Sequence, residues 1–233
     1  MPGIGSLQKS LKVKFKNPSW LEQALVHSSY LNEYPGSALA ANERLEFLGD
    51  AILGLIVAEK LYRDFPGMAE GEMTRIRSIL VRRETLAHIA AGLKLGDYLY
   101  LGRGEEAGGG RRKPANLAAV LEAVVAAIFL DSGLAAARKA VLGWLDNEFK
   151  EVIGQGKGID YKSRLQELVQ SQYRASPAYR TVQATGPDHD RLFTVEAMLG
   201  DRVLGRGSGK SRKLAETEAA RQALAQMGSI FTP

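Results

Sequence analysis

One helical segment, in which three carboxylates precede a wholly apolar stretch, most constrains how this chain can fold. Residues 42–50 read NERLEFLGD, and residues 51–58 carry no polar side chain. A helix that is apolar on all sides is buried, so we expect residues 51–58 to lie in a protein core. At about 100° per residue, Glu43, Glu46 and Asp50 fall within an arc of about 60°. These acids therefore share one stripe of a buried helix, where they repel one another and lose hydration.

A further acid lies in the most apolar part of the chain. Glu122 is the single charged residue within 114–130. A carboxylate in such a helix is paired with a cation, protonated, or bound to a metal ion. If this helix packs against the one that contains Glu46 and Asp50, the acids form an oxygen-only site, which suits Mg²⁺ or Mn²⁺ better than zinc or copper. Such a site hydrolyses phosphodiesters by activating a water molecule. For the stripe of three acids at 43–50, the alternative is a solvated helix edge with Arg44 as a partner.

The lack of cysteine and the small number of histidines exclude several other kinds of functional site. The chain has no cysteine, which excludes a disulfide scaffold, a cysteine-based zinc site and a thiol nucleophile. Its three histidines, His27, His88 and His189, are far apart in sequence, so we expect no histidine-rich metal site. The first residues lack the basic-then-apolar pattern of a signal peptide, and the apolar run at 114–130 is too short and too interrupted to span a bilayer. We therefore expect a cytoplasmic protein with no membrane partner.

The sequence pattern divides the chain into two domains. Long apolar segments without strand-like alternation predict an all-α domain at 1–152, and three glycines within five residues predict a linker at 153–158. Residues 159–230 form a small α+β (αβββα) domain by the same reasoning, with Asp160 as the N-cap of its first helix. We expect the main helices of the first domain at 43–63, 72–92 and 115–131. In the second domain we expect helices at 160–172 and 211–227 and strands at 178–184, 192–198 and 202–207.

Positive charge is concentrated in the second domain. Residues 156–233 hold 12 basic and 8 acidic side chains, whereas residues 1–155 hold 19 and 18. Lys210, Arg212 and Lys213 lie at the start of the last helix, where backbone amides and the helix dipole favour phosphate. This distribution indicates a polyanionic partner without identifying it.

The segment NERLEFLGD at 42–50 resembles the signature of ribonuclease III in an unbroken nine-residue match. Further short matches to that family follow along the first domain, at 65–66, 70–71, 75–77, 101–102, Glu105 with 109–110, 122–123 and 129–131. The C-terminal part of the chain resembles the double-stranded RNA-binding domain of the same family. The resemblance implies a homodimeric endoribonuclease that cuts both strands of duplex RNA and depends on Mg²⁺, with Mn²⁺ as a substitute. It also implies short 3′ overhangs as products and a role in processing ribosomal RNA precursors and other structured transcripts.

Several residues take their roles from this resemblance. Glu46 and Glu122 correspond to metal ligands, and Asp50 and Glu122 to catalytic residues. A further family acid, usually Asp, falls where this chain has Ala119, so one metal ligand is missing. The alternative function is therefore a cleavage-impaired protein that binds double-stranded RNA. Asn116, one turn away, is a weak candidate to replace the missing ligand.

Other matched positions leave two readings open. Phe47 corresponds to an aromatic knob at the dimer interface, with ordinary core packing as the alternative. Glu43, Glu70 and Glu105 match family acids, with structural or salt-bridge roles as the alternatives. In the second domain, the resemblance implies contacts to the minor grooves and phosphates of duplex RNA from Ser163, Gln166, Glu167, His189, Lys210, Arg212 and Lys213.

Overall fold

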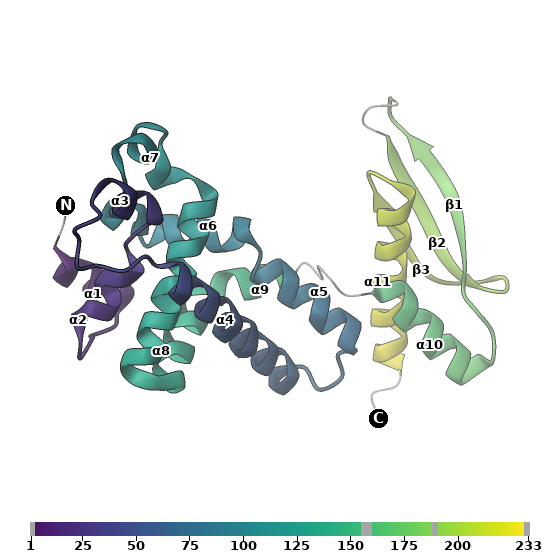
Figure 1. Cartoon of the computed structure of the whole chain (residues 1–233). Helices are drawn as coiled ribbons and strands as arrows, with labels where there is room; N and C mark the ends of the chain where they lie inside the picture. The colour runs from purple at the N-terminus through teal and green to yellow at the C-terminus, as the bar shows by residue number, and fades with distance from the viewer. Residues whose placement is uncertain (1–2, 155–159, 188–190, 231–233) are drawn as a thin grey trace. The chain divides into compact units, whose positions relative to one another are not determined.

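The computed structural model describes residues 3–154, 160–187 and 191–230, and the chain separates into two compact units, Met1–Gly158 and Ile159–Pro233 (Figure 1). The first unit is helical, as expected, and the second is an αβββα unit. His189 lies outside the described residues. The two units are described separately below.

Nine α-helices and two short 3-10 turns build the described part of the first unit. They are α1 (Ile4–Leu11), α2 (Pro18–Ala24), α3 (Ser28–Glu33), α4 (Glu43–Asp64), α5 (Glu70–Leu80), α6 (Arg83–Gly92), η1 (Leu95–Tyr98), α7 (Arg103–Ala107), η2 (Gly110–Arg112), α8 (Pro114–Trp144) and α9 (Asp146–Gly154). The expected helix at 72–92 is two helices, which meet between Leu80 and Arg83. Helix α9 continues to Gly154, into the segment 153–158 that we expected to be a linker.

Helix α8 is the core helix of the first unit. It packs against α4, α6 and α2, and the side chains from Ala123 to Ile128 are fully buried. The helix bends at Gly133, whose φ of 83° is a conformation that glycine adopts without steric strain. Within the described residues, α8 is the one helix long and apolar enough to cross a membrane, and 56% of its most apolar stretch is buried inside the fold. That burial is typical of a core helix.

Helix α4 is buried on one side only. Ile52, Leu53, Ile56 and Val57 are buried, but Leu55 is 53% exposed. Phe47 and Tyr62 extend the same face and are 82% and 73% exposed. The expectation that residues 51–58 are buried on all sides is therefore wrong for a single chain, because α8 covers only one face of α4. The core-packing alternative for Phe47 is wrong for the same reason.

The second unit is a three-stranded antiparallel sheet with two helices. Its elements are α10 (Tyr161–Tyr173), β1 (Ala178–Thr185), β2 (Leu192–Leu199), β3 (Arg202–Gly209) and α11 (Arg212–Ile230). The strands pair in the order β1-β2-β3, and Figure 1 shows both helices on the same side of the sheet. The Asp160 carboxylate accepts a hydrogen bond from the backbone N–H of Ser163 at 3.1 Å, so the expected N-cap is confirmed.

Glycines on β3 let α11 lie against the sheet. A Cβ on Gly207 would be 2.2 Å from the backbone nitrogen of Ala219, and a Cβ on Gly205 would be 2.4 Å from that of Ala223. A side chain at either glycine would push the helix away. This close contact fixes the start of α11, where the expected basic residues lie, relative to the sheet.

Candidate functional site

Helices α4 and α8 meet at Gly49 and Glu122. A Cβ built on Gly49 would lie 1.8 Å from the carbonyl oxygen of Glu122 and 2.4 Å from its carbonyl carbon. Only a residue without a side chain fits at this contact. Gly49 directly precedes Asp50 and lies one turn after Glu46, so the contact brings Glu122 beside both acids.

Burial and neighbouring negative charge raise the pKa values of Glu46 and Glu122. Glu122 is half-buried, and burial, followed by the negative charges of Asp50 and Glu46, raises its pKa to about 7. Burial and the charges of Glu43 and Asp50 also raise the pKa of Glu46, while the charge of His27 opposes the shift. The acids that the sequence predicted on one stripe of α4 therefore share one electrostatic environment with Glu122.

Cation pairing does not explain Glu122. The charge of Arg83 acts to lower the pKa of Glu122, but burial and the acids outweigh it. No salt bridge to Glu122 is found in the described part of the chain. The sequence left three explanations for a carboxylate at Glu122, namely a cation partner, protonation or a bound metal ion. The last two remain.

The donor chemistry of the cluster fits a hard divalent cation. Carboxylate oxygens are the ligands that Mg²⁺ prefers, and a cation would offset the mutual repulsion of the acids. The side chains do not already converge on one point. Across residues 3–154, 160–187 and 191–230, no group of three Asp, Glu, His or Cys side chains is spaced to hold a metal ion.

Ala119 lies one turn before Glu122 on the same face of α8 and contributes no oxygen. The amide nitrogen of Asn116 donates to Oε1 of Glu105 at 2.8 Å and to the carbonyl oxygen of Gly110 at 3.0 Å. Asn116 therefore holds the turn before α8. The structure gives no support to Asn116 as a replacement ligand.

The other matched acids differ in their contacts. Glu105 forms a salt bridge with Lys113 at 2.8 Å, and the hydrogen bonds from Lys113 and Asn116 lower its pKa. The salt-bridge reading is confirmed for Glu105. Glu70 instead accepts a hydrogen bond from Oγ1 of Thr74 at 2.9 Å.

His27 received no chemical role from the sequence, yet it belongs to the surroundings of the acids. Its backbone N–H donates to the carbonyl oxygen of Tyr100 at 3.1 Å, and its Nδ1 lies 2.8 Å from Oγ of Ser29. Its charge acts to lower the pKa of both Glu46 and Glu105. No local pattern could reveal this, because the fold brings these residues together from separate segments.

In the second unit, the described candidate RNA contacts lie at two exposed places. Ser163, Gln166 and Glu167 are exposed on α10, and Lys210, Arg212 and Lys213 are exposed at the start of α11. Nε of Arg212 donates to Oε1 of Glu216 at 3.0 Å, so its charge is partly neutralised. Glu216 also accepts from Nζ of Lys162 at 2.6 Å. Sequence reasoning missed Lys162, whose partner is 54 residues away.

Comparison with known proteins covers both units. The family model described as Ribonuclease-III-like matches residues 17–148, and the model of the double-stranded RNA binding motif matches residues 161–227. The chain is 53% identical to Ribonuclease 3 of Dehalococcoides mccartyi, across 100% of this chain and 98% of that protein. It is 46% identical to Ribonuclease 3 of Geobacter sulfurreducens, across 95% of this chain and 89% of that protein.

Solved structures give a similar result for the first unit. The nuclease domain of ribonuclease III from Campylobacter jejuni matches with a TM-score of 0.58 and 39% sequence identity, covering 63% of this chain and 99% of that chain. A second structure of that domain matches with the same TM-score and covers 64% of this chain. The Campylobacter domain has a flexible region involved in dimer formation.

Proposed function

Because this chain belongs to the ribonuclease III family of double-stranded RNA endoribonucleases, we propose that Glu46, Asp50 and Glu122 form its active site. The observation that carries the proposal is the contact of Gly49 with the backbone of Glu122, which brings acids from two helices together. The raised pKa values of Glu46 and Glu122 support it, because perturbed carboxylates gather at functional sites.

Each acid has a distinct role in the proposal. Glu46 and Glu122 would hold Mg²⁺, for which Mn²⁺ can substitute, and the ion would there help to activate water and to offset charge on the leaving oxygen. Asp50 is exposed beside them and completes the site as a ligand or by positioning water. Above its pKa of about 7, Glu122 is ionised and available to the cation even before binding.

The second unit supplies most of the duplex affinity. Exposed polar side chains on α10, namely Ser163, Gln166 and Glu167, contact one of the two successive minor grooves that such domains bind. Lys210, Arg212 and Lys213 contact the phosphates between these grooves. Arg212 contributes less charge to this contact than an unpaired arginine, since it shares Glu216 with Lys162.

The exposed apolar face of α4 supports a homodimer. Phe47, Leu55 and Tyr62 lie on one face and are 82%, 53% and 73% exposed. A contiguous apolar face of this kind marks a protein interface, and a second copy of this chain is the partner. Two active sites in a symmetric dimer cut opposite strands and leave short 3′ overhangs. Precursors of ribosomal RNA and other structured transcripts in the cytoplasm are the proposed substrates.

The proposal is tested with a labelled RNA duplex and a titration of Mg²⁺. Glu122→Gln keeps the shape of the side chain and removes its charge, so it should abolish cleavage while duplex binding in a gel-shift assay is unchanged. Asp64→Asn is the matched control, because Asp64 is an exposed acid at the far end of α4 that pairs with Lys60. This variant should cut at the unmodified rate.

Two outcomes would count against the proposal. If Glu122→Gln cuts as fast as the unmodified chain, Glu122 is not a metal ligand. If the unmodified chain binds the duplex without cutting it at any Mg²⁺ or Mn²⁺ concentration, the cleavage-impaired binder is the correct reading. The absence of an oxygen at Ala119 is the observation that favours this second function.

A further inference from the structure

Asn42, the residue before α4, has a polar side chain that is buried in the first unit. It is 3% exposed, and among the polar and charged side chains of the described residues only Glu72 is buried as deeply. An asparagine at this position of a helix usually accepts a hydrogen bond from one of the first backbone N–H groups. The side chain of Asn42 makes no such bond, and its backbone is already helical, with φ −79° and ψ −10°. The side chain therefore serves a purpose other than capping.

Asn42 attaches the start of α4 to the end of α2. Its Nδ2 donates to the carbonyl oxygen of Ala24 at 3.2 Å, and its backbone N–H donates to the carbonyl oxygen of Val26 at 2.8 Å. Ala24 is the last residue of α2, so its carbonyl has no partner within that helix. Because the two hydrogen bonds lie two residues apart on one segment, they fix both the position and the orientation of Asn42.

The segment that receives Asn42 is itself held in place. Ala24, Leu25 and Val26 are at most 1% exposed. Between the two carbonyls that bind Asn42, the carbonyl of Leu25 accepts from the backbone N–H of Tyr100 at 2.9 Å. Asn42 is therefore attached to a buried segment that a third part of the chain also holds.

This attachment acts on Glu46. The carbonyl oxygen of Asn42 accepts a hydrogen bond from the backbone N–H of Glu46 at 2.8 Å, one turn into α4. Three residues after Glu46, Gly49 lies against the backbone of Glu122. Glu46 thus lies between two anchors, of which Asn42 fixes the start of α4 and Gly49 fixes its contact with α8.

The first turn of α4 needs an anchor because its acids repel one another. Burial and the negative charges of Glu43 and Asp50 raise the pKa of Glu46. Helix ends fray, and fraying here would relieve the repulsion by moving Glu46 away from Glu122. We propose that Asn42 is a positioning residue that holds Glu46 beside Glu122, where both can bind one divalent cation. This role rests on the proposed function, because it concerns the same acids.

The test uses the full chain and two variants, Asn42→Ala and Asn42→Ser. Serine can still cap a helix, but it is too short to reach the carbonyl of Ala24. Without metal, the backbone N–H of Glu46 should exchange with solvent at least about tenfold faster in both variants. Calorimetric titration with Mn²⁺ should give a dissociation constant at least about tenfold higher in both, whereas duplex affinity should stay unchanged. Asparagine that only stabilised the fold would lower the free energy of unfolding without changing Mn²⁺ affinity in the folded protein.

Gln23→Ala is the matched control at the same junction. Nε2 of Gln23 donates to the carbonyl oxygen of Ala41 at 3.4 Å, so the substitution removes a side-chain hydrogen bond next to Asn42. Both hydrogen bonds from Asn42 to the end of α2 remain. Gln23→Ala should therefore bind Mn²⁺ as tightly as the unmodified chain.

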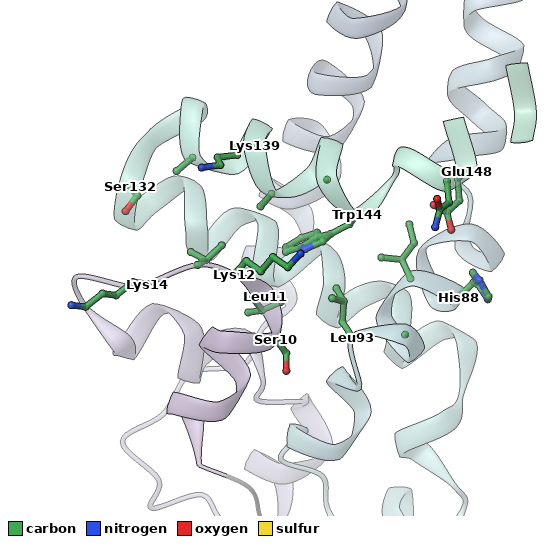
Figure 2. Close-up of a pocket in the computed structure, with 17 residues that line it drawn as sticks. Ser10, Leu11, Lys12, Lys14, His88, Leu93, Ser132, Lys139, Trp144 and Glu148 are labelled. Atoms are coloured by element: carbon green, nitrogen blue, oxygen red, sulfur yellow. The ribbon is translucent and has the colours of Figure 1, made fainter. Parts of the chain in front are cut away.

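A second control removes an asparagine from the start of another helix. Asn147, at the start of α9, lines a pocket of about 650 Å³ between the end of α1, helix α6 and the second part of α8 (Figure 2). None of the acids of the proposed active site lines this pocket. Asn147→Ala should leave both Mn²⁺ affinity and the exchange of the Glu46 amide unchanged.

The outcomes distinguish this role from the proposed function. If the unmodified chain binds Mn²⁺ and Asn42→Ala binds it equally tightly, the positioning role is overturned and the proposed active site stands. Full Mn²⁺ affinity in Asn42→Ser alone would also overturn it, since capping would then suffice. If the unmodified chain binds no Mn²⁺, the proposed active site fails, and the role of Asn42 fails with it.

Discussion

The ammonium group of Lys162 lies 2.6 Å from Oε2 of Glu216 and joins the first helix of the second unit to its last. Lys162 also lies over the ring of Tyr179, with Nζ 4.7 Å from the ring centroid. The other oxygen of Glu216 accepts from Arg212 at 3.0 Å. One largely buried carboxylate thus sets the relative position of α10 and α11, the two helices with the described candidate RNA contacts.

Replacing Glu216 with Gln should lower the free energy of unfolding of the second unit by about 1–2 kcal/mol at neutral pH. Hydrogen bonds from Lys162, then from Arg212, hold the pKa of Glu216 below its usual value of 4.5. The contribution is therefore present above pH 4.5 and is lost as the pH falls through the lower folded-state pKa. Denaturant unfolding of both proteins at several pH values checks this. A difference that persists undiminished in acid would show that charge is not the cause.

The contact between α4 and α8 can be tested with two glycines of the same helix. Gly49→Ala places a Cβ against the backbone of Glu122, so it should cost about 1–3 kcal/mol of stability and reduce cleavage by displacing Glu122. Gly54→Ala meets nothing within 4 Å and should stabilise the helix by up to about 1 kcal/mol. Thermal unfolding and duplex cleavage are measured for both. Similar effects of the two substitutions would show that α8 does not lie against Gly49.

The protonation of Glu122 predicts how stability depends on pH without metal. Its folded-state pKa is about 7 against a usual 4.5, so the folded protein holds a proton that the unfolded chain has released. The free energy of unfolding therefore falls as pH rises from 4.5 to 7. Glu122→Gln removes this penalty, and its advantage in melting temperature in EDTA should grow across that window. A constant advantage at all pH values would rule out titration of Glu122 as the cause.

The exposed face of α4 predicts a dimer that depends on Phe47. Phe47→Ala removes an aromatic ring that is 82% exposed in the single chain, so it should raise the dimer dissociation constant at least about tenfold. Tyr173→Ala is the control, because Tyr173 is 44% exposed at the end of α10. Sedimentation equilibrium gives both constants. If Phe47→Ala dimerises as tightly as the control, another surface forms the interface.

Local sequence patterns predicted the order of helices and strands well, because turn residues and the alternation of apolar and polar side chains are local properties. The three strands of the second unit lie within three residues of the expected bounds. The acidic stripe was also predictable, since Glu43, Glu46 and Asp50 belong to one helix. The burial of α4 was not, because an apolar face reads the same whether its own chain or a second copy covers it.

Local patterns could not show which distant segments touch, and only the family resemblance grouped Glu122 with Glu46 and Asp50. Gly49 gives no local sign that Glu122 lies against it, and Lys162 gives none of its pairing with Glu216. Each of these relationships exists only once the helices have packed.

We expect Ala119 to limit how well this chain cuts RNA. It lies one turn before Glu122 on the same face of α8, so an acid at this position would add carboxylate oxygens beside Glu122. With Ala119 in place, the cluster keeps Glu46, Asp50 and Glu122 but carries less charge, so we expect slow cleavage at low Mg²⁺ and partial recovery at higher Mg²⁺ or with Mn²⁺.

Ala119→Asp should raise the cleavage rate at low Mg²⁺ at least about tenfold, equivalent to about 1.4 kcal/mol of transition-state stabilisation. Ala119→Asn is the matched control for size, because it adds an amide oxygen without a charge and should recover much less activity. Duplex affinity should be equal in all three proteins, since the second unit supplies it. If the unmodified chain already cuts at the rate of Ala119→Asp in low Mg²⁺, the three remaining acids suffice for the metal, and no fourth carboxylate is needed at this site.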